Sequence, residues 1–280
     1  MSILKVLVAG VVLLTLLGGV SMAQDGVTRY VRYAHQGREL YGVLEGETIR
    51  ELEGDLFSAP RETGTTVALS DVRLLAPCRP SKVIAIGLNY RSHLGDRPVP
   101  EHLGVFSKFP TSVIAPEESI VIPGDSEGVH YEGELVVVIG KEASRVSVGE
   151  APQHIFGVTA GNDVSERTWQ RDDLQWFRAK GSDTFAPLGP VIVAGLDYND
   201  LTIETRLNGE VKQHESSADL IFSVDEIVSY VSRYVTLFPG DIIFTGTPGS
   251  TSAMQPGDIV EVEIEGIGIL RNTVTKESEE

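Results

Sequence analysis

The chain is poor in cysteine and in basic residues. Its 280 residues include one cysteine, Cys78, which excludes a disulfide within the chain and a metal site built from several cysteines. Lysine and arginine together number 23 against 40 acidic residues, so the formal net charge is −17. Nucleic acid and anionic membrane surfaces are therefore poor partners. An anionic substrate would need a locally positive pocket to overcome the overall charge.

Low-complexity segments and long-period repeats are also missing. The 29 glycines and 14 prolines are scattered along the chain, and hydrophobic residues make up 41% of it. This composition excludes collagen-like and disordered classes and is typical of a turn-rich, β-dominated globular protein. The length suffices for one good-sized domain and a smaller one.

The first residues contain an apolar run. Lys5 precedes the apolar segment 6–20, and a small-x-small tripeptide ends at Ala23, as in a signal peptide cleaved after that residue. The run is too short to predict a membrane span. We expect a signal peptide over residues 1–23 and export, to the periplasm in a bacterium. A cytoplasmic protein that starts at Met22 is the alternative.

A β-meander is predicted near the amino terminus. Three short segments alternate polar and apolar residues between turn-forming sequences; they are residues 30–33, 40–44 and 48–52. A loop that contains Pro60 and Gly64 is expected next, and Pro77 and Pro80 would then interrupt any strand ladder.

The remainder of the chain is also expected to be rich in strands. Helices are predicted mainly over Ser165–Phe177 and over Ser223–Tyr234, where Ser223 is a suitable N-cap. The prediction is therefore a mixed, β-rich α+β fold. Its proposed divisions are a small amino-terminal β domain, a catalytic-sized domain and a short acidic tail, at residues 24–80, 81–275 and 276–280.

Three carboxylates are the most informative residues. Glu132 and Glu134 stand two apart at the head of the apolar run 135–139, and Asp163 follows in Gly-Asn-Asp. Alternate residues of a strand share a face, so both glutamates would point into one place. A solvated strand face is the alternative, but the continuous apolar run indicates a strand covered on both sides. Buried like charges favour a hard divalent cation.

Other motifs occur in an order that resembles one family. They are Gly87-Leu88-Asn89-Tyr90 with His93, Phe106-Ser107-Lys108, Glu132-Gly133-Glu134, Asp163 with Arg167 and Gln170, Ala179-Lys180, and Gly246-Thr247-Pro248. Together they resemble the fumarylacetoacetate hydrolase family from about Lys82 to about Thr273. The opening meander is similar to the small amino-terminal domain that many members carry.

The resemblance implies a fold, a cofactor and a substrate class. The fold would be a mixed β-roll or sandwich-like catalytic domain, usually in a homodimer. The metal would be Mg²⁺, Mn²⁺ or Ca²⁺, held by Glu132, Glu134 and Asp163. The substrate would be a small oxo acid chelated through its carboxylate and keto oxygens, so a local cation would receive the anion.

The resemblance also implies roles for the remaining residues. Lys180 would stabilise enolate charge beside the metal. Arg167 and Gln170 would face the site from one helical turn. Lys108 and Thr247 would bind the substrate. Each residue also has an alternative without a functional role. Lys180 would be a surface lysine, Arg167 and Gln170 would lie on a solvated helix face, and Thr247 would belong to an ordinary turn.

His93 is the candidate general base, because histidine exchanges protons near neutral pH. In the resemblance it belongs to a His-x-x-Glu pair that closes over the metal and activates water. This chain has Asp96 at the glutamate position, and its shorter side chain would weaken the pair unless Glu101 substitutes. The departure leaves the reaction type open.

Three hypotheses follow. The leading one is a metal-dependent hydrolase that cleaves a carbon–carbon bond in acylpyruvate-like or fumarylpyruvate-like 1,3-dicarbonyl acids. The second is an isomerase, tautomerase or decarboxylase of oxaloacetate or a hydroxymuconate-type diacid. The third is an exported protein that binds an oxo acid or a metal without turnover.

Overall fold

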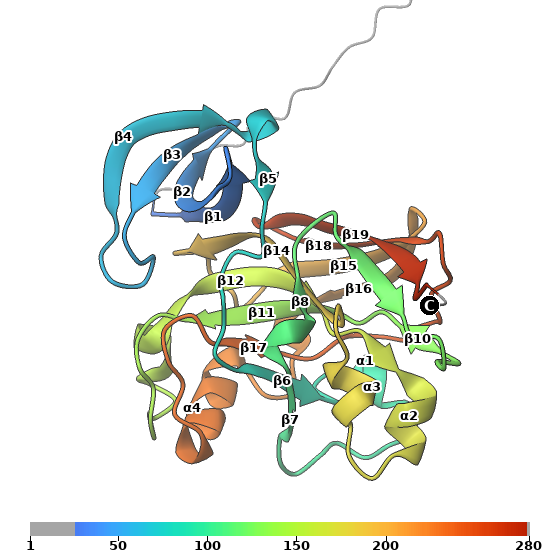
Figure 1. The fold of residues 1–280 in the computed structure, drawn as a ribbon. Coiled ribbons are helices and arrows are strands. Elements are labelled where there is room, and N and C mark those ends of the chain that lie inside the picture. The colour runs from blue at the N-terminus through green and yellow to red at the C-terminus, as the bar shows by residue number, and fades with distance from the viewer. Residues whose placement is uncertain (1–25, 279–280) are drawn as a thin grey trace, which may run out of the picture.

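The computed structural model describes residues 26–278 (Figure 1). The predicted signal peptide and the alternative start at Met22 therefore lie outside the described residues. No helix in the described part is long and apolar enough to cross a membrane. Of the predicted acidic tail, Lys276 ends the last strand, and residues 279–280 are not described.

The amino-terminal meander is confirmed, with one strand more than predicted. Its antiparallel strands are β1 (Thr28–His35), β2 (Arg38–Glu45), β3 (Thr48–Glu53) and β4 (Arg61–Ala68). The expectation of a loop containing Gly64 is wrong, because this residue lies within β4. Nearly all of β4 is exposed, so the strand lacks the apolar alternation that predicts strands from sequence.

The meander continues into the main sheet. Arg29 of β1 pairs with Val193 of β14 (Ala186–Ala194), so the lobe that stands apart in Figure 1 is hydrogen-bonded to the rest. The order along the sheet is β4-β3-β2-β1-β14-β12-β11-β17-β6-β7, with β5 beside β1 and β8 beside β14. The strands not yet defined are β5 (Arg73–Leu74), β6 (Val83–Gly87), β7 (Gly104–Lys108), β8 (Val113–Ile114), β11 (Gly133–Ile139), β12 (Ile155–Asn162) and β17 (Ile242–Phe244).

A second sheet packs on the first. Its order is β16 (Glu210–Ser216), β15 (Thr202–Leu207), β18 (Ile259–Ile264), β19 (Gly268–Lys276) and β9 (Ser119–Ile122). Val262 and Leu270 of this sheet share one hydrophobic core with Leu135 and Val137 of β11. Two inward faces therefore enclose a common core, as in a sandwich. A further pair, β10 (Val129–His130) and β13 (Ser165–Glu166), lies apart from both sheets.

Glycine at position 133 permits the close approach of the two sheets. A Cβ added to Gly133 would lie 1.9 Å from Oγ1 of Thr205 on β15. The glutamates on either side of Gly133 therefore project away from this contact. Gly133 is needed for packing, and its position sets the face on which the glutamates lie.

The helices are few and short. They are α1 (Arg91–Leu94), α2 (Arg167–Asp172), α3 (Phe177–Gly181) and α4 (Val224–Tyr234), with 3₁₀ turns at Leu69–Asp71, Pro110–Ser112, Ala151–His154 and Ser217–Asp219. The helix predicted over Ser165–Phe177 is wrong in extent, since only α2 and the start of α3 fall within it. Acidic residues are unfavourable at a helix C-terminus, and α2 ends at Asp172-Asp173, where Asp173 pairs with Arg178 instead.

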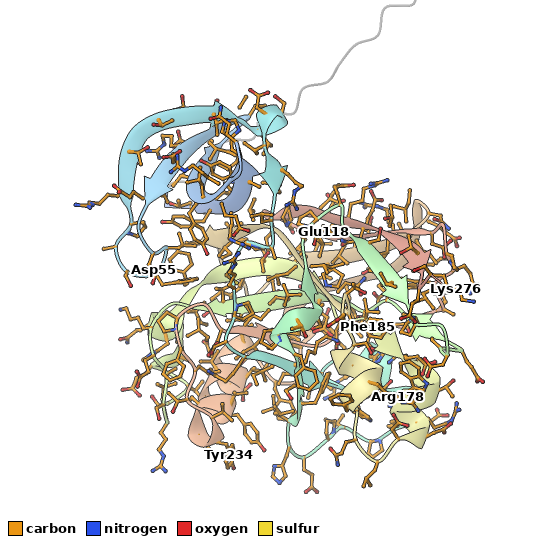
Figure 2. All side chains as sticks on the ribbon, viewed as in Figure 1. Asp55, Glu118, Arg178, Phe185, Tyr234 and Lys276 are labelled. Carbon is orange, nitrogen blue, oxygen red and sulfur yellow. The ribbon has the colours of Figure 1, made fainter. Side chains whose placement is uncertain are left out.

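The second predicted helix is confirmed as α4. Ser223 caps it in a capping box with Glu226, and Ile227 and Val231 bury one face in the core. Figure 2 shows the outer end of α4 at Tyr234, which is exposed, whereas Phe185 lies inside the molecule. The observed architecture is therefore mixed α+β and strand-rich, as predicted.

Candidate active site

The three carboxylates converge at one end of the β11–β12 pair. Gly133 pairs with Asn162, so Glu132 and Asp163 both lie at the same end of the ladder. The main-chain N–H of Asp163 donates to the carbonyl of Glu132 over 2.8 Å. Ligand oxygens of Glu132, Glu134 and Asp163 lie within 4.8 Å of one another, and all three residues are buried. The grouping predicted from sequence is thus brought together.

Glu134 is the carboxylate of the three without a cationic partner among residues 26–278. Its Oε2 accepts a hydrogen bond from the Gly246 N–H at 2.7 Å. Burial, together with the charges of Asp163 and Glu132, raises the pKa of Glu134 well above its ordinary value. A buried carboxyl that resists ionisation beside two others provides a suitable place for a cation. The all-oxygen donor set fits a hard divalent ion such as Mg²⁺ or Mn²⁺.

Two lysines neutralise the other carboxylates. Lys180 Nζ donates to Glu132 Oε2 at 2.6 Å and to Asp163 Oδ2 at 2.7 Å. Burial opposes its charge, but attraction to Asp163 and Glu132 prevails and raises the pKa of Lys180. Lys108 Nζ lies 2.5 Å from Asp163 Oδ1 and is fully enclosed. Lys108 therefore holds Asp163 in place.

Arg167 joins the site from the first turn of α2. Its Nη2 donates to Glu132 Oε1 at 2.5 Å and to Thr251 Oγ1 at 2.9 Å. Its Nη1 donates to Gln170 Oε1 at 2.7 Å. Glu166 caps this helix by accepting from the Trp169 N–H. Arg167 and Gln170 thus lie on one helical turn and face the same side of the site, as predicted. Burial opposes the ionisation of Glu132, but the positive charges of Lys180 and Arg167 outweigh it. They hold the pKa of Glu132 well below its ordinary value.

The glycine turn 246–249 closes another side of the site. Gly246 has a φ of +111°, and a Cβ there would lie 2.7 Å from the Cβ of Asn89, so glycine is required. Thr247 Oγ1 donates to the carbonyl of Gly133 at 3.0 Å and accepts from Gln213 Nε2 at 2.8 Å. Gln213 also accepts from the Gly133 N–H at 3.1 Å. It ties this turn to β11 from the second sheet.

His93 lies in the short helix α1. Its Nδ1 is 2.5 Å from the carbonyl oxygen of Gly249, and its Nε2 is 3.8 Å from Glu132 Oε1. Asp96 is exposed and makes no side-chain hydrogen bond or ion pair within the described chain. The predicted His93–Asp96 pair is therefore not formed. Glu101 is also exposed. A main-chain carbonyl orients the imidazole instead.

A cavity of about 690 Å³ opens beside these residues. Its lining includes His93, Glu132, Glu134, Arg167, Gln170, Lys180 and Thr247 from the predicted set. Asp163 and Lys108 are buried behind this lining, and Asp96 is not part of it. The structure therefore gives Lys108 a supporting position and does not place it where a substrate would bind.

Several lining residues were not identified as functional from the sequence. They are Ser92, Arg97, Arg171, Trp176 and Thr251. Phe106 was part of a quoted motif but received no role; its ring lies 4.8 Å from Lys180 Nζ and 5.1 Å from the Trp176 ring. Aromatic residues spaced far apart give no sequence signal for such a cluster. For Arg97, the sequence did offer a signal: it directly follows Asp96, the residue expected to pair with His93.

Comparisons with known proteins identify the family of this chain. Residues 82–275 match the family described as fumarylacetoacetate (FAA) hydrolase C-terminal, and residues 28–77 match Rv2993c-like, N-terminal. The chain is 45% identical over 235 residues to Protein Rv2993c of Mycobacterium tuberculosis, covering 82% of this chain and 88% of that one. It is 40% identical over 259 residues to the mitochondrial oxaloacetate tautomerase FAHD2A of Bos taurus, covering 87% and 79%.

Solved structures are similar over nearly the whole chain. The 2-hydroxyhepta-2,4-diene-1,7-dioate isomerase from Mycobacterium marinum superposes with a TM-score of 0.85 at 41% identity, covering 90% of this chain and 100% of that one. Maleylpyruvate hydrolase from Sphingobium sp. SYK-6, in complex with manganese(II) and pyruvate, gives a TM-score of 0.75 at 25% identity, covering 89% and 100%. By sequence and fold, this chain belongs to the fumarylacetoacetate hydrolase family.

Proposed function

We propose that the protein is a divalent-metal-dependent isomerase or tautomerase of small oxo acids. The observation that carries this proposal is the pairing of His93 Nδ1 with the Gly249 carbonyl, with Asp96 facing solvent. A histidine so oriented can move a proton between substrate atoms. The carboxylate expected to help it activate water is not beside it. This reverses the order of the first two hypotheses drawn from the sequence.

Glu132, Glu134 and Asp163 are the residues that would hold the metal. Bound there, a divalent ion would neutralise the carboxylates and polarise the carbonyl of an oxo acid. Mg²⁺ and Mn²⁺ both suit oxygen ligands. The manganese complex of maleylpyruvate hydrolase supports the same choice for a relative.

Arg167 and Lys180 supply the positive charge that an anionic substrate needs. Two of the N–H donors of Lys180 are engaged by Glu132 and Asp163, so its third remains for a substrate oxygen in the cavity that it lines. Gln170 and Arg167 hydrogen-bond to each other and form one wall. These residues would fix the oxo-acid end and stabilise negative charge that develops on the keto oxygen.

His93 would carry the proton. Its Nδ1–H donates to the Gly249 carbonyl, so the lone pair of the neutral ring is on Nε2, which faces the cavity. Nε2 would take a proton from the carbon next to the keto group, leaving the electron pair delocalised onto the keto oxygen. Return of that proton to oxygen completes a tautomerisation. Its return to another carbon shifts a double bond.

The named relatives support this ranking. The tautomerase and the isomerase are 40% and 41% identical to this chain, whereas the maleylpyruvate hydrolase is 25% identical. Carbon–carbon hydrolysis is the second candidate, because that hydrolase retains the fold over 89% of this chain. Glu101 or a moved Asp96 would then have to assist water attack.

Nuclear magnetic resonance of metal-loaded protein in deuterated buffer tests the proposal. The panel comprises oxaloacetate, a hydroxymuconate-type diacid, an acylpyruvate and fumarylpyruvate. We expect deuterium exchange or a shifted double bond with the carbon skeleton intact, abolished by a chelator. Release of pyruvate from an acylpyruvate would instead establish the hydrolase. Binding with no exchange and no product would establish the third hypothesis, a binding protein.

Assembly and compartment are further proposals. A homodimer is expected from the family resemblance, and Leu174 and Phe177 provide exposed apolar surface at 95% and 71% exposure. Analytical ultracentrifugation of wild type and of Phe177→Asp would test both points. A monomeric wild type would refute the dimer. Export remains the expectation for the amino-terminal segment, which cell fractionation of the full-length chain would test.

A further inference from the structure

Among residues 26–278, one arginine of the cavity lining has no carboxylate partner. The cationic residues of the lining are Arg97, Arg167, Arg171 and Lys180. Arg167 and Lys180 pair with Glu132, and Arg171 makes two hydrogen bonds to Asp172, at 2.7 and 3.0 Å. Arg97 has no side-chain hydrogen bond or ion pair within residues 26–278.

Arg97 is far more exposed than the carboxylates and the lysine that line the same cavity. Glu132, Glu134 and Lys180 are 4%, 1% and 2% exposed, whereas Arg97 is an exposed residue. The cavity lining therefore combines buried charged groups with one exposed guanidinium that has no side-chain partner among residues 26–278. A bound molecule that spans the cavity would meet both.

Arg97 lies in the same short segment as His93, the proposed proton carrier. The Arg97 N–H donates to the Leu94 carbonyl at 3.2 Å, which closes a turn directly after α1. Pro98 follows and restricts the conformation of Arg97. His93 and Arg97 therefore share one short segment that borders the cavity.

The overall charge makes an unpaired cation here informative. With a net charge of −17, the protein repels anions at long range, and acidic partners for a surface arginine are abundant. A guanidinium that lines a cavity without one is suited to a carboxylate of the ligand, which it can bind through two parallel hydrogen bonds.

We propose that Arg97 is the subsite for the second carboxylate of a dicarboxylic oxo acid, whose oxo-acid end lies at Glu132, Glu134 and Asp163. The inference rests on the proposed function for the placement of the oxo-acid end. It narrows the substrate class to oxo acids that carry a second carboxylate. Arg97 is then a specificity-determining residue, separate from the proton transfer.

Binding of two chain-matched ligands tests this assignment. 2-Oxoadipate and 2-oxohexanoate have the same number of carbons and differ in the terminal carboxylate. Calorimetry with manganese-loaded wild type should show tighter binding of the diacid. Arg97→Gln should weaken 2-oxoadipate binding by roughly 10- to 100-fold and leave 2-oxohexanoate unchanged. Arg97→Lys should show an intermediate loss, because it keeps the charge without the paired donors.

Arg171→Gln is the matched control, since it removes an exposed lining arginine already bound to Asp172. It should retain the wild-type ratio of the two affinities. A wild type that binds both ligands equally, or an Arg97→Gln variant with the wild-type ratio, would overturn the assignment. Discrimination by Arg97 in a protein that turns over none of the oxo acids would refute the proposed function and leave the subsite standing.

Discussion

His93 is oriented by Gly249. The 2.5 Å separation between His93 Nδ1 and the Gly249 carbonyl oxygen fixes which ring nitrogen carries hydrogen, because a carbonyl can only accept. The Gly249 N–H in turn donates to Oγ of Ser92, the residue before His93, at 2.9 Å. Ser92 is hydrogen-bonded to Glu215 on the second sheet. The proton-carrying residue is therefore positioned from the glycine turn.

The first prediction concerns proton transfer. His93→Gln should lower kcat for the proposed tautomerisation by about 100- to 10,000-fold, the usual contribution of a general base. Manganese affinity should stay nearly unchanged, because the ring nitrogen nearest to the carboxylates is 3.8 Å from Glu132 Oε1. Steady-state kinetics and metal titration measure the two effects separately.

Asp96→Asn is the control for that experiment. Asp96 is exposed and outside the cavity lining, so kcat should change by about twofold or less. If Asp96→Asn were as damaging as His93→Gln, the two residues would act together in catalysis, and the hydrolytic mechanism would regain first place.

The second prediction concerns metal binding and protons. Burial and the charges of Asp163 and Glu132 raise the pKa of Glu134, so the metal-free protein holds a proton there above the usual range for a carboxyl. A metal needs the ionised form, and binding should therefore release a proton. Calorimetry of Mn²⁺ binding in buffers of different ionisation enthalpy would measure this release. Metal affinity should fall as the pH is lowered through the raised pKa.

The same shift has a consequence for stability. In the unfolded chain Glu134 ionises at its ordinary pKa, whereas in the metal-free fold it stays protonated to higher pH. The unfolded state thus binds fewer protons in this window, and metal-free stability should fall as pH rises. Glu134→Gln should lessen this fall and weaken Mn²⁺ binding by roughly 100-fold or more. A metal-free wild type and variant with parallel pH–stability curves would contradict the assignment.

The carboxylate site could be predicted because it depends on local sequence. Glu132 and Glu134 share a strand face for geometrical reasons, and a single antiparallel pairing brings Asp163 to them. The partner of His93 could not be predicted, because the Gly249 carbonyl belongs to the main chain and has no residue-type signal. Asp96, at the expected spacing, was therefore the natural choice, but its side chain makes no hydrogen bond to His93 within residues 26–278.

Long-range contacts limited the prediction elsewhere. The pairing of β1 with β14 joins residues that are far apart in the sequence, such as Arg29 and Val193. Nothing in the local sequence pattern specifies this pairing. The role of Lys108 also depends on long-range contacts. Its motif indicated a functional residue, but only the fold shows that its ammonium group is hydrogen-bonded to Asp163. Local periodicity predicts elements, and tertiary pairing decides which charges remain free for a ligand.

The third prediction concerns the contact between the sheets. Gly133→Ala should destabilise the protein by about 1–3 kcal/mol, because the added Cβ would lie 1.9 Å from Thr205 Oγ1. Chemical denaturation with metal absent would measure the loss. Gly149→Ala is the control, since a Cβ there meets nothing within 4 Å. Adding Thr205→Ala should recover part of the stability, and failure of that rescue would place the strain elsewhere.

The fourth prediction uses the single cysteine. Cys78 is 1% exposed, and burial raises the pKa of its thiol to about 12. Because the thiolate is the reactive form, native protein at mildly alkaline pH should resist iodoacetamide, and protein in concentrated guanidinium chloride should react fully. Mass spectrometry would follow the modification at this one site.

Since Cys78 packs in the same cluster as Val83 and Ile242 of the main sheet, its labelling rate should fall when Mn²⁺ is added and stabilises the fold. Rapid labelling of the native protein, unaffected by Mn²⁺, would show that this part of the sheet opens independently of the metal site.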